Sequence, residues 1–153
     1  KHRQLVVENP WFTGKAEVTT YELDELLGTK LRALYQRRKG RDLFDLWLCL
    51  NRELVDPNRV VKCFLAYMER EGAAVSRAEF ERTLHEKQNK PSFLADLIPL
   101  LAEGVAYGAA TAMTLIRKTL IERLPGEPWR GRMAPNEIKR PQGSPGRSGK
   151  RKR

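Results

Sequence analysis

Apolar residues recur at helical spacing from residue 19 to residue 50 and predict two helices that pack back to back around a short basic turn. Thr19 followed by Glu22 has the form of a capping box, so the first helix is expected to begin just after Thr19. Gly40 is expected to let the chain reverse direction before a second helix over residues 43–50. The apolar stripe of the first helix consists of Leu23, Leu26, Leu27, Leu31, Leu34 and Tyr35.

Capping signals continue the helical pattern downstream. Asp56, followed by proline at the first helical position, predicts a helix that runs to about residue 71. Ser76 and Glu79 form a second capping box and predict a more polar helix through about residue 87.

The remaining apolar segments are also predicted to be helical. Residues 93–102 have helical spacing, and Pro99 is expected to kink this segment or divide it in two. A long helix is expected over residues 105–124, where several small residues would let a neighbouring helix approach closely.

The N-terminal segment has a different pattern. Residues 4–7 are apolar and residues 15–21 contain a β-branched cluster, with turn residues at Asn9, Pro10 and Gly14 between them. Two strands alone are marginally stable in water. We therefore expect them to be the last strands of a sheet whose other members lie upstream.

Charge separates the C-terminal segment from the rest of the chain. Nine Lys or Arg residues and one Glu lie in residues 129–153, which carry +8 of the formal net charge of +10. This segment is rich in Pro, Gly and Ser, so it is expected to be a disordered basic tail. The predicted organisation is terminal strands over residues 1–19, a helical domain over 20–128 and the tail over 129–153. The fold class is mainly α with one or two short N-terminal strands.

Other features point to a cytoplasmic protein. No apolar run is long enough to span a membrane, and the N-terminus lacks the apolar centre of a signal peptide. Cys49 and Cys63 lie on apolar helical stretches and are expected to be reduced core thiols. Trp11, Trp47 and Trp129 are interpreted as packing anchors, although Trp129 stands where the basic tail begins.

The candidate chemistry lies in the first helical pair, where Lys30 faces Asp42 and Asp45 at the start of the next helix. This arrangement suits an anionic ligand or a metal ion. The structural alternatives are a solvated Lys30, helix capping by the two carboxylates, and an ion pair between Arg41 and Asp45.

The same stretch resembles the AbiEii/AbiGii toxin family, nucleotidyltransferases of the DNA-polymerase-β-like superfamily that are paired with an antitoxin. The resemblance covers about thirty residues with high specificity. The segment LIERLPGEPW is similar to the way such proteins end. The matching residues are Glu25, Lys30, Leu31, Arg32, Ala33, Leu34, Tyr35, Arg41, Asp42, Leu43, Asp45 and Leu46.

The resemblance implies an α+β nucleotidyltransferase that acts in abortive infection as part of a type IV toxin–antitoxin system. It implies transfer of nucleotides from an NTP, with Mg²⁺, onto an RNA acceptor such as tRNA. It assigns catalytic roles to Lys30 and Asp42, phosphate binding to Lys30 and Arg41, and a metal-ligand role to Asp42. The family's Gly-Ser turn followed by an Asp-x-Asp pair does not occur in this chain. The chain therefore resembles the C-terminal half of such a protein and is expected to be inactive alone.

Two alternatives stay open. The first is a non-enzymatic helical module that binds nucleic acid through the basic tail, where phosphates would contact Arg147, Lys150, Arg151, Lys152 and Arg153. The second is a decayed reading frame without a selected function. Deleting residues 131–153 separates the binding module from a toxin fragment, because only the module would lose most of its affinity.

Overall fold

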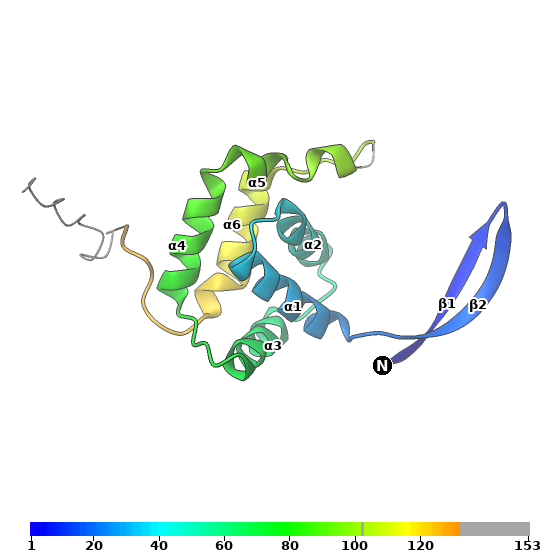
Figure 1. Ribbon diagram of the computed structural model, residues 1–153, viewed down its shortest axis with the longest axis horizontal. Coiled ribbons are helices and arrows are strands. Elements are labelled where there is room, and N and C mark those ends of the chain that lie inside the picture. Colours follow the sequence, from blue (N-terminus) through cyan, green and yellow to red (C-terminus); the bar gives the residue numbers. More distant parts are fainter. Residues whose placement is uncertain (102, 132–153) are drawn as a thin grey trace, which may run out of the picture.

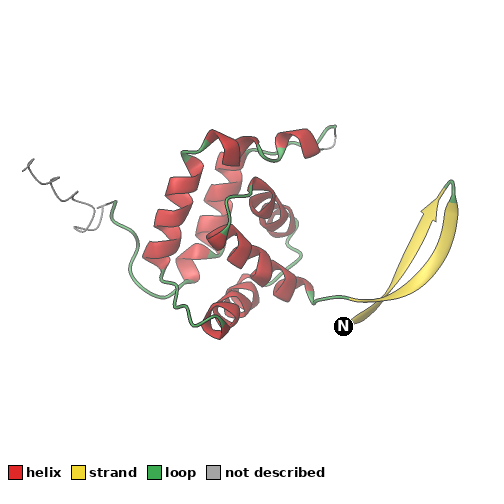
Figure 2. Ribbon diagram, viewed as in Figure 1, coloured by secondary structure: helices red, strands yellow, loops and turns green. Residues whose placement is uncertain are grey.

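The computed structural model describes residues 1–101 and 103–131 and shows a helical body with a projecting β-hairpin (Figure 1). The predicted fold class, mainly α with short N-terminal strands, is confirmed (Figure 2). The strands are β1 (His2–Asn9) and β2 (Phe12–Thr19). The helices are α1 (Leu23–Gln36), α2 (Gly40–Asn51), α3 (Pro57–Arg70), α4 (Arg77–Gln88), α5 (Pro91–Ala95), η1 (Ile98–Leu100), α6 (Ala109–Thr119) and η2 (Ile121–Arg123).

Helix α1 is the centre of the body, and it packs against α3 more extensively than any other two helices pack together. It also contacts α2 and α4, while α2 packs against α6. The predicted apolar stripe of α1 supplies Leu27, Leu31 and Leu34 to the core. The largest side chains that are fully buried come from all six α-helices and the η2 region: Phe64, Phe80, Phe93, Leu27, Leu31, Leu34, Leu43, Leu46, Leu84, Ile116, Leu120 and Ile121.

Two of the three predicted helix N-caps are confirmed. Asp56 caps α3 by accepting a hydrogen bond from the Asn58 backbone N–H at 2.9 Å. Ser76 and Glu79 form the expected capping box of α4. The predicted box at Thr19 is wrong, because Thr19 pairs with His2 at the end of β2 and α1 begins only at Leu23. The β-ladder therefore takes the residue that would have capped the helix.

The N-terminal strands form an antiparallel hairpin in which His2 pairs with Thr19 and Asn9 with Phe12. The turn at Asn9 is confirmed: its side-chain oxygen accepts hydrogen bonds from the backbone N–H groups of Trp11 and Phe12 at 3.0 and 2.9 Å. Gly14 lies inside β2, opposite Val7, and not in a turn as predicted. The expected strands thus exist, and their ladder runs the full length of both.

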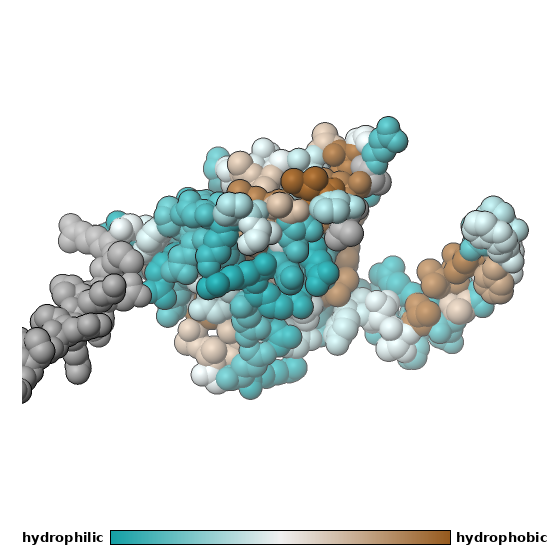
Figure 3. Space-filling view, turned by 45° about the horizontal axis from the view of Figure 1, so that its top comes forward, coloured by the Kyte–Doolittle hydropathy of each residue, from teal (hydrophilic) through white to brown (hydrophobic). Residues whose placement is uncertain are grey.

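The hairpin projects away from the helices, and hydrophobic side chains gather on it (Figures 1 and 3). Leu5 and Val6 are about half exposed, Phe12 is 61% exposed and Trp11 is 90% exposed. Trp11 was interpreted as a packing anchor, and the structure corrects this: its side chain packs against almost nothing. The hairpin therefore carries apolar surface that the described residues do not cover.

The C-terminal helices are shorter than predicted. Residues 93–102 divide before Pro99 into α5 and η1, as expected. The predicted helix over 105–124 is instead α6, which begins after Gly108, followed by the 3-10 turn η2. The small-residue half still allows close packing, because Ala112 is fully buried on α6, a helix that packs against α2.

Gly40 serves close packing and not chain reversal. It is the first residue of α2 and is buried, and a Cβ at this position would overlap the backbone oxygen of Phe93. The chain reverses instead through extended residues at Arg37 and Lys39, which flank α1 and α2. Glycine is therefore required here for the approach of α5 to α2.

The remaining sequence predictions concern the cysteines, membrane spans and the tail. Cys49 and Cys63 are free and partly buried, in agreement with their interpretation as packed thiols. No helix in the described ranges is long and apolar enough to cross a membrane. The predicted disorder of the tail, and its candidate nucleic-acid contacts from Arg147 to Arg153, lie outside the described residues.

Candidate functional site

Lys30 on α1 faces two carboxylates on α2, as the sequence predicted. Its ammonium nitrogen lies 2.7 Å from an oxygen of Asp45 and 3.8 Å from Oδ1 of Asp42. Asp42 is fully buried, whereas the Lys30 side chain is 32% exposed. The site therefore has a buried anionic floor and a cation that reaches solvent.

Arg37 completes this cluster, and sequence reasoning missed it. Its guanidinium donates to both oxygens of Asp42, at 3.0 and 3.2 Å. Charge-assisted pairing of this kind fixes orientation as well as distance. Arg37 belongs to the short basic turn that the sequence predicts between the two helices, and the signal for its role is its position at the end of α1, beside the start of α2.

The position of Asp42 in α2 differs from the capping alternative. The helix begins at Gly40 after Lys39, so Asp42 is in the first turn and not at the N-cap. A carboxylate there is still favoured by the partial positive charge of the helix N-terminus. Its burial, however, makes Lys30 and Arg37 necessary partners, since an unpaired buried charge is costly.

Arg41 does not join the cluster. It is exposed on α2, and the ion pairs found within residues 1–101 and 103–131 include none of Arg41. The alternative of an Arg41–Asp45 pair is wrong, because Asp45 pairs with Lys30 instead. The cation that shares the cluster with Lys30 is therefore Arg37.

A hollow of about 260 Å³ opens on the solvent side of Lys30 and Arg37. Arg32 lines it as well, and both Arg32 and Gln36 are held by the carboxylate of Glu71 on the far side. The wall is thus rich in fixed donors and has no carboxylate of its own. Its lining residues are Thr29, Lys30, Arg32, Ala33, Gln36 and Arg37.

The carboxylates of the cluster do not fit a magnesium site. Both Asp42 oxygens accept hydrogen bonds from Arg37, and Lys30 lies between Asp42 and Asp45. Within the part of the chain that the structure describes, no three His, Cys, Asp or Glu residues gather as metal ligands. The arrangement suits an anion placed on the cations, and Asp42 does not fit the predicted role of metal ligand.

Lys87 lies beneath the same helix end. Its ammonium donates to the backbone oxygens of Leu34 and, at 2.8 Å, Tyr35, so it satisfies carbonyls at the C-terminus of α1. Lys87 is only 3% exposed, and burial, with the nearby Arg38 charge, lowers its pKa to about 8. Sequence analysis missed this contact, although the helical period places Lys87 on the inward face three residues after Leu84.

The lowered pKa of Lys87 makes stability depend on pH. Between about pH 8 and 10.5, Lys87 keeps its proton in the unfolded chain and has lost it in the folded chain. The free energy of unfolding therefore rises with pH across this range, and this gain is lost as the pH falls through 8. We expect the unfolding free energy of wild type, relative to that of Lys87→Met, to rise by up to about 1.4 kcal/mol per pH unit in this window. Urea titrations of both proteins from about pH 7 to pH 10 measure it. A constant difference would contradict the buried ammonium.

Comparison with known proteins places the cluster in a family. A family model described as "Nucleotidyl transferase AbiEii toxin, Type IV TA system" matches residues 2–114, well over half of the chain. The match spans the hairpin, the Lys30 cluster and the start of α6. Searches of curated proteins and of solved structures gave no match. The chain therefore belongs to the AbiEii family of nucleotidyltransferase toxins of type IV toxin–antitoxin systems.

Proposed function

We propose that this chain is the C-terminal part of a nucleotidyltransferase toxin that transfers nucleotides from an NTP onto an RNA acceptor such as tRNA. The observation that carries the proposal is the cationic hollow over the buried carboxylate of Asp42. In it Lys30 and Arg37 bind the triphosphate, and Asp42 positions both cations. Family membership implies a cognate antitoxin as partner.

The donor count of the cluster supports phosphate binding. A lysine ammonium carries three donors, so Lys30 retains one for a phosphate oxygen while it contacts Asp42 and Asp45. Arg37 is 54% exposed and has further N–H groups beyond those on Asp42. Cations fixed in advance are the main protein contribution to phosphoryl-type transfer, because they stabilise charge without reorganising.

The projecting hairpin supports a catalytic part contributed from elsewhere. Its two strands have no further partner strand among the described residues, and apolar side chains on it are exposed. A sheet carrying the Gly-Ser turn and the Asp-x-Asp pair would cover that surface and extend the ladder. In the proposed protein Mg²⁺ is held by that pair and not by Asp42. The 153-residue chain alone is therefore inactive.

A reconstitution experiment tests the proposal. The chain is fused behind the Gly-Ser and Asp-x-Asp segment of a complete family member, and labelling of tRNA from radioactive NTPs is measured. We expect labelling by the fusion and none by the chain alone. Labelling by the chain alone, or an inactive but folded fusion, would contradict the proposal.

If Lys30 binds the triphosphate, a substitution at Lys30 should slow nucleotide transfer by an active fusion. Lys30→Gln should lower transfer by about tenfold, the scale of one lost charge-assisted hydrogen bond. Lys62→Gln is the matched control, because it removes the same charge from a residue that is exposed on α3 and does not line the hollow. Equal rates for the two variants would show that Lys30 does not bind the triphosphate.

A further inference from the structure

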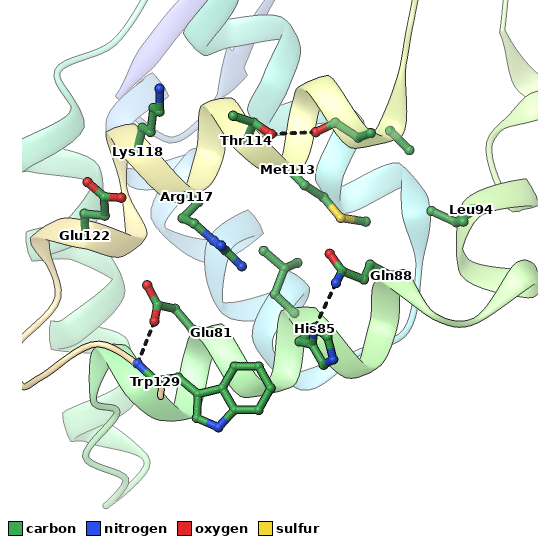
Figure 4. Close-up of a pocket in the computed structure, with 13 residues that line it drawn as sticks. Glu81, His85, Gln88, Leu94, Met113, Thr114, Arg117, Lys118, Glu122 and Trp129 are labelled. Carbon is green, nitrogen blue, oxygen red and sulfur yellow. Dashed lines mark hydrogen bonds between the residues drawn. The ribbon is translucent and has the colours of Figure 1, made fainter. Parts of the chain in front are cut away.

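A second cavity lies between α4 and α6 (Figure 4), and it shares no lining residue with the hollow at Lys30. It has a volume of about 890 Å³. Buried Leu84 and Met113 form an apolar floor, and the segment after η2 closes one end with Trp129. We call this cavity the α4–α6 groove.

One end of the groove is an aromatic wall. The rings of Trp129 and His85 lie 4.8 Å apart between centroids, at an interplanar angle of 49°. The Trp129 backbone N–H donates to Glu81 at 2.8 Å, and Arg77 holds the other Glu81 oxygen at 3.0 Å. Glu81 is 5% exposed, and both of its carboxylate oxygens are paired within the fold. Its bond to the Trp129 backbone holds the indole at the mouth of the groove.

A cation extends from the opposite wall. Arg117 extends from α6 across the groove toward α4, whereas the ammonium end of Lys118 points away from the groove (Figure 4). Both side chains belong to exposed residues, and neither forms an ion pair with another described residue. The second carboxylate of the lining, Glu122, lies 3.7 Å from Arg77. The groove therefore offers the Arg117 guanidinium to an external anion.

We propose that the α4–α6 groove binds a nucleotide of single-stranded RNA, with its base against Trp129 and its phosphate on Arg117. A nucleotide base binds against an aromatic face and an apolar surface, and the adjoining phosphate binds a cation. The groove supplies these features through Trp129, the apolar floor and Arg117. This inference deepens the proposed function, since it locates a contact for the RNA acceptor outside the triphosphate site.

The test measures equilibrium binding without any NTP. The probe is a fluorescein-labelled single-stranded RNA of mixed sequence, titrated with the full chain at about 150 mM salt, where non-specific contacts are weakened. We expect Arg117→Ala to raise the Kd about fivefold to tenfold. Arg82→Ala is the matched control: Arg82 is exposed on α4, does not line the groove, and removes the same charge. It should change the Kd by less than about twofold.

Trp129 provides the readout for base stacking. Trp129→Ala should raise the Kd by about fivefold to a hundredfold, the range for loss of one stacked base. Trp129→Phe keeps an aromatic face and should retain most of the affinity, which separates stacking from a general loss of folding. The inference is overturned if wild type does not bind the RNA, or if Arg117→Ala and Arg82→Ala weaken binding equally.

Two controls separate the ligand class and the proposed function. The first control measures the binding of a fluorescein-labelled poly-glutamate peptide. If that binding depends on Arg117 and Trp129 as strongly as RNA binding does, the assignment to RNA is overturned in favour of an acidic peptide. If the fusion fails to transfer nucleotides but the chain binds RNA through Arg117 and Trp129, the proposed function is contradicted and RNA binding by the groove is supported. If the fusion is active but RNA binding does not depend on the groove residues, only the inference about the groove is contradicted.

Discussion

Replacing Asp42 with alanine is expected to lower the free energy of unfolding by about 2–4 kcal/mol. Asp42 is fully buried and joins α1, through Lys30, and the following turn, through Arg37, to α2. Removing it leaves both cations without their shared acceptor and opens a void. The loss should fall short of the upper range for buried pairs, because Lys30 and Arg37 reach solvent on one side.

Urea denaturation of the full chain measures this loss, and Glu103→Ala is the control. Glu103 is exposed in the loop before α6, so its removal should change stability by less than about 0.5 kcal/mol. A double-mutant cycle with Arg37→Met and Lys30→Met divides the effect. We expect the larger coupling for Arg37, whose contacts are 3.0 and 3.2 Å, than for Lys30 at 3.8 Å. A loss no greater than that of the control would refute the buried anchor.

Gly28→Ala is expected to destabilise the protein by about 2–4 kcal/mol, although alanine is the better helix former. Gly28 is buried in α1 where that helix crosses α3. A Cβ there would lie 2.6 Å from Cys63 Cβ and 3.1 Å from the Phe64 backbone nitrogen. Because a backbone atom is involved, the two helices must separate, and the contact between α1 and α3 loses packing along its length.

The sign of this change is the diagnostic result. On helix propensity alone, Gly28→Ala would stabilise α1 by about 1 kcal/mol. Ala66→Gly, at an exposed position inside α3, calibrates the propensity term and should cost about that amount. Thermal and urea denaturation of both variants give the comparison. A more stable Gly28→Ala would mean that α1 and α3 do not approach as closely as described.

Local signals predicted much of the fold. The caps at Asp56 and Ser76 were predictable because the capping residue and its partner N–H lie within three residues of each other. The box at Thr19 failed because the hairpin ladder, formed with His2, competed for the same residue. Local capping is thus a reliable signal only where no long-range pairing claims the cap.

The candidate site was predictable in part. Lys30 and Asp42 were found because they lie on consecutive helices whose faces follow from the apolar period. Arg37 and Lys87 were missed for different reasons: Arg37 depends on the path of the turn, and Lys87 reaches α1 from a helix more than fifty residues away. The close approach at Gly40 was also invisible, since it depends on where α5 docks.

The uncovered hairpin has a consequence for handling the protein. Neither outer edge of the hairpin is paired with another strand of the described residues, and such open edges are a template for strand addition by another copy, which leads to aggregation. Charged residues along the strands, Arg3, Glu8, Lys15 and Glu17, oppose such pairing. The colloidal behaviour of the isolated chain therefore depends on these four side chains, and raising the ionic strength should make it associate more readily.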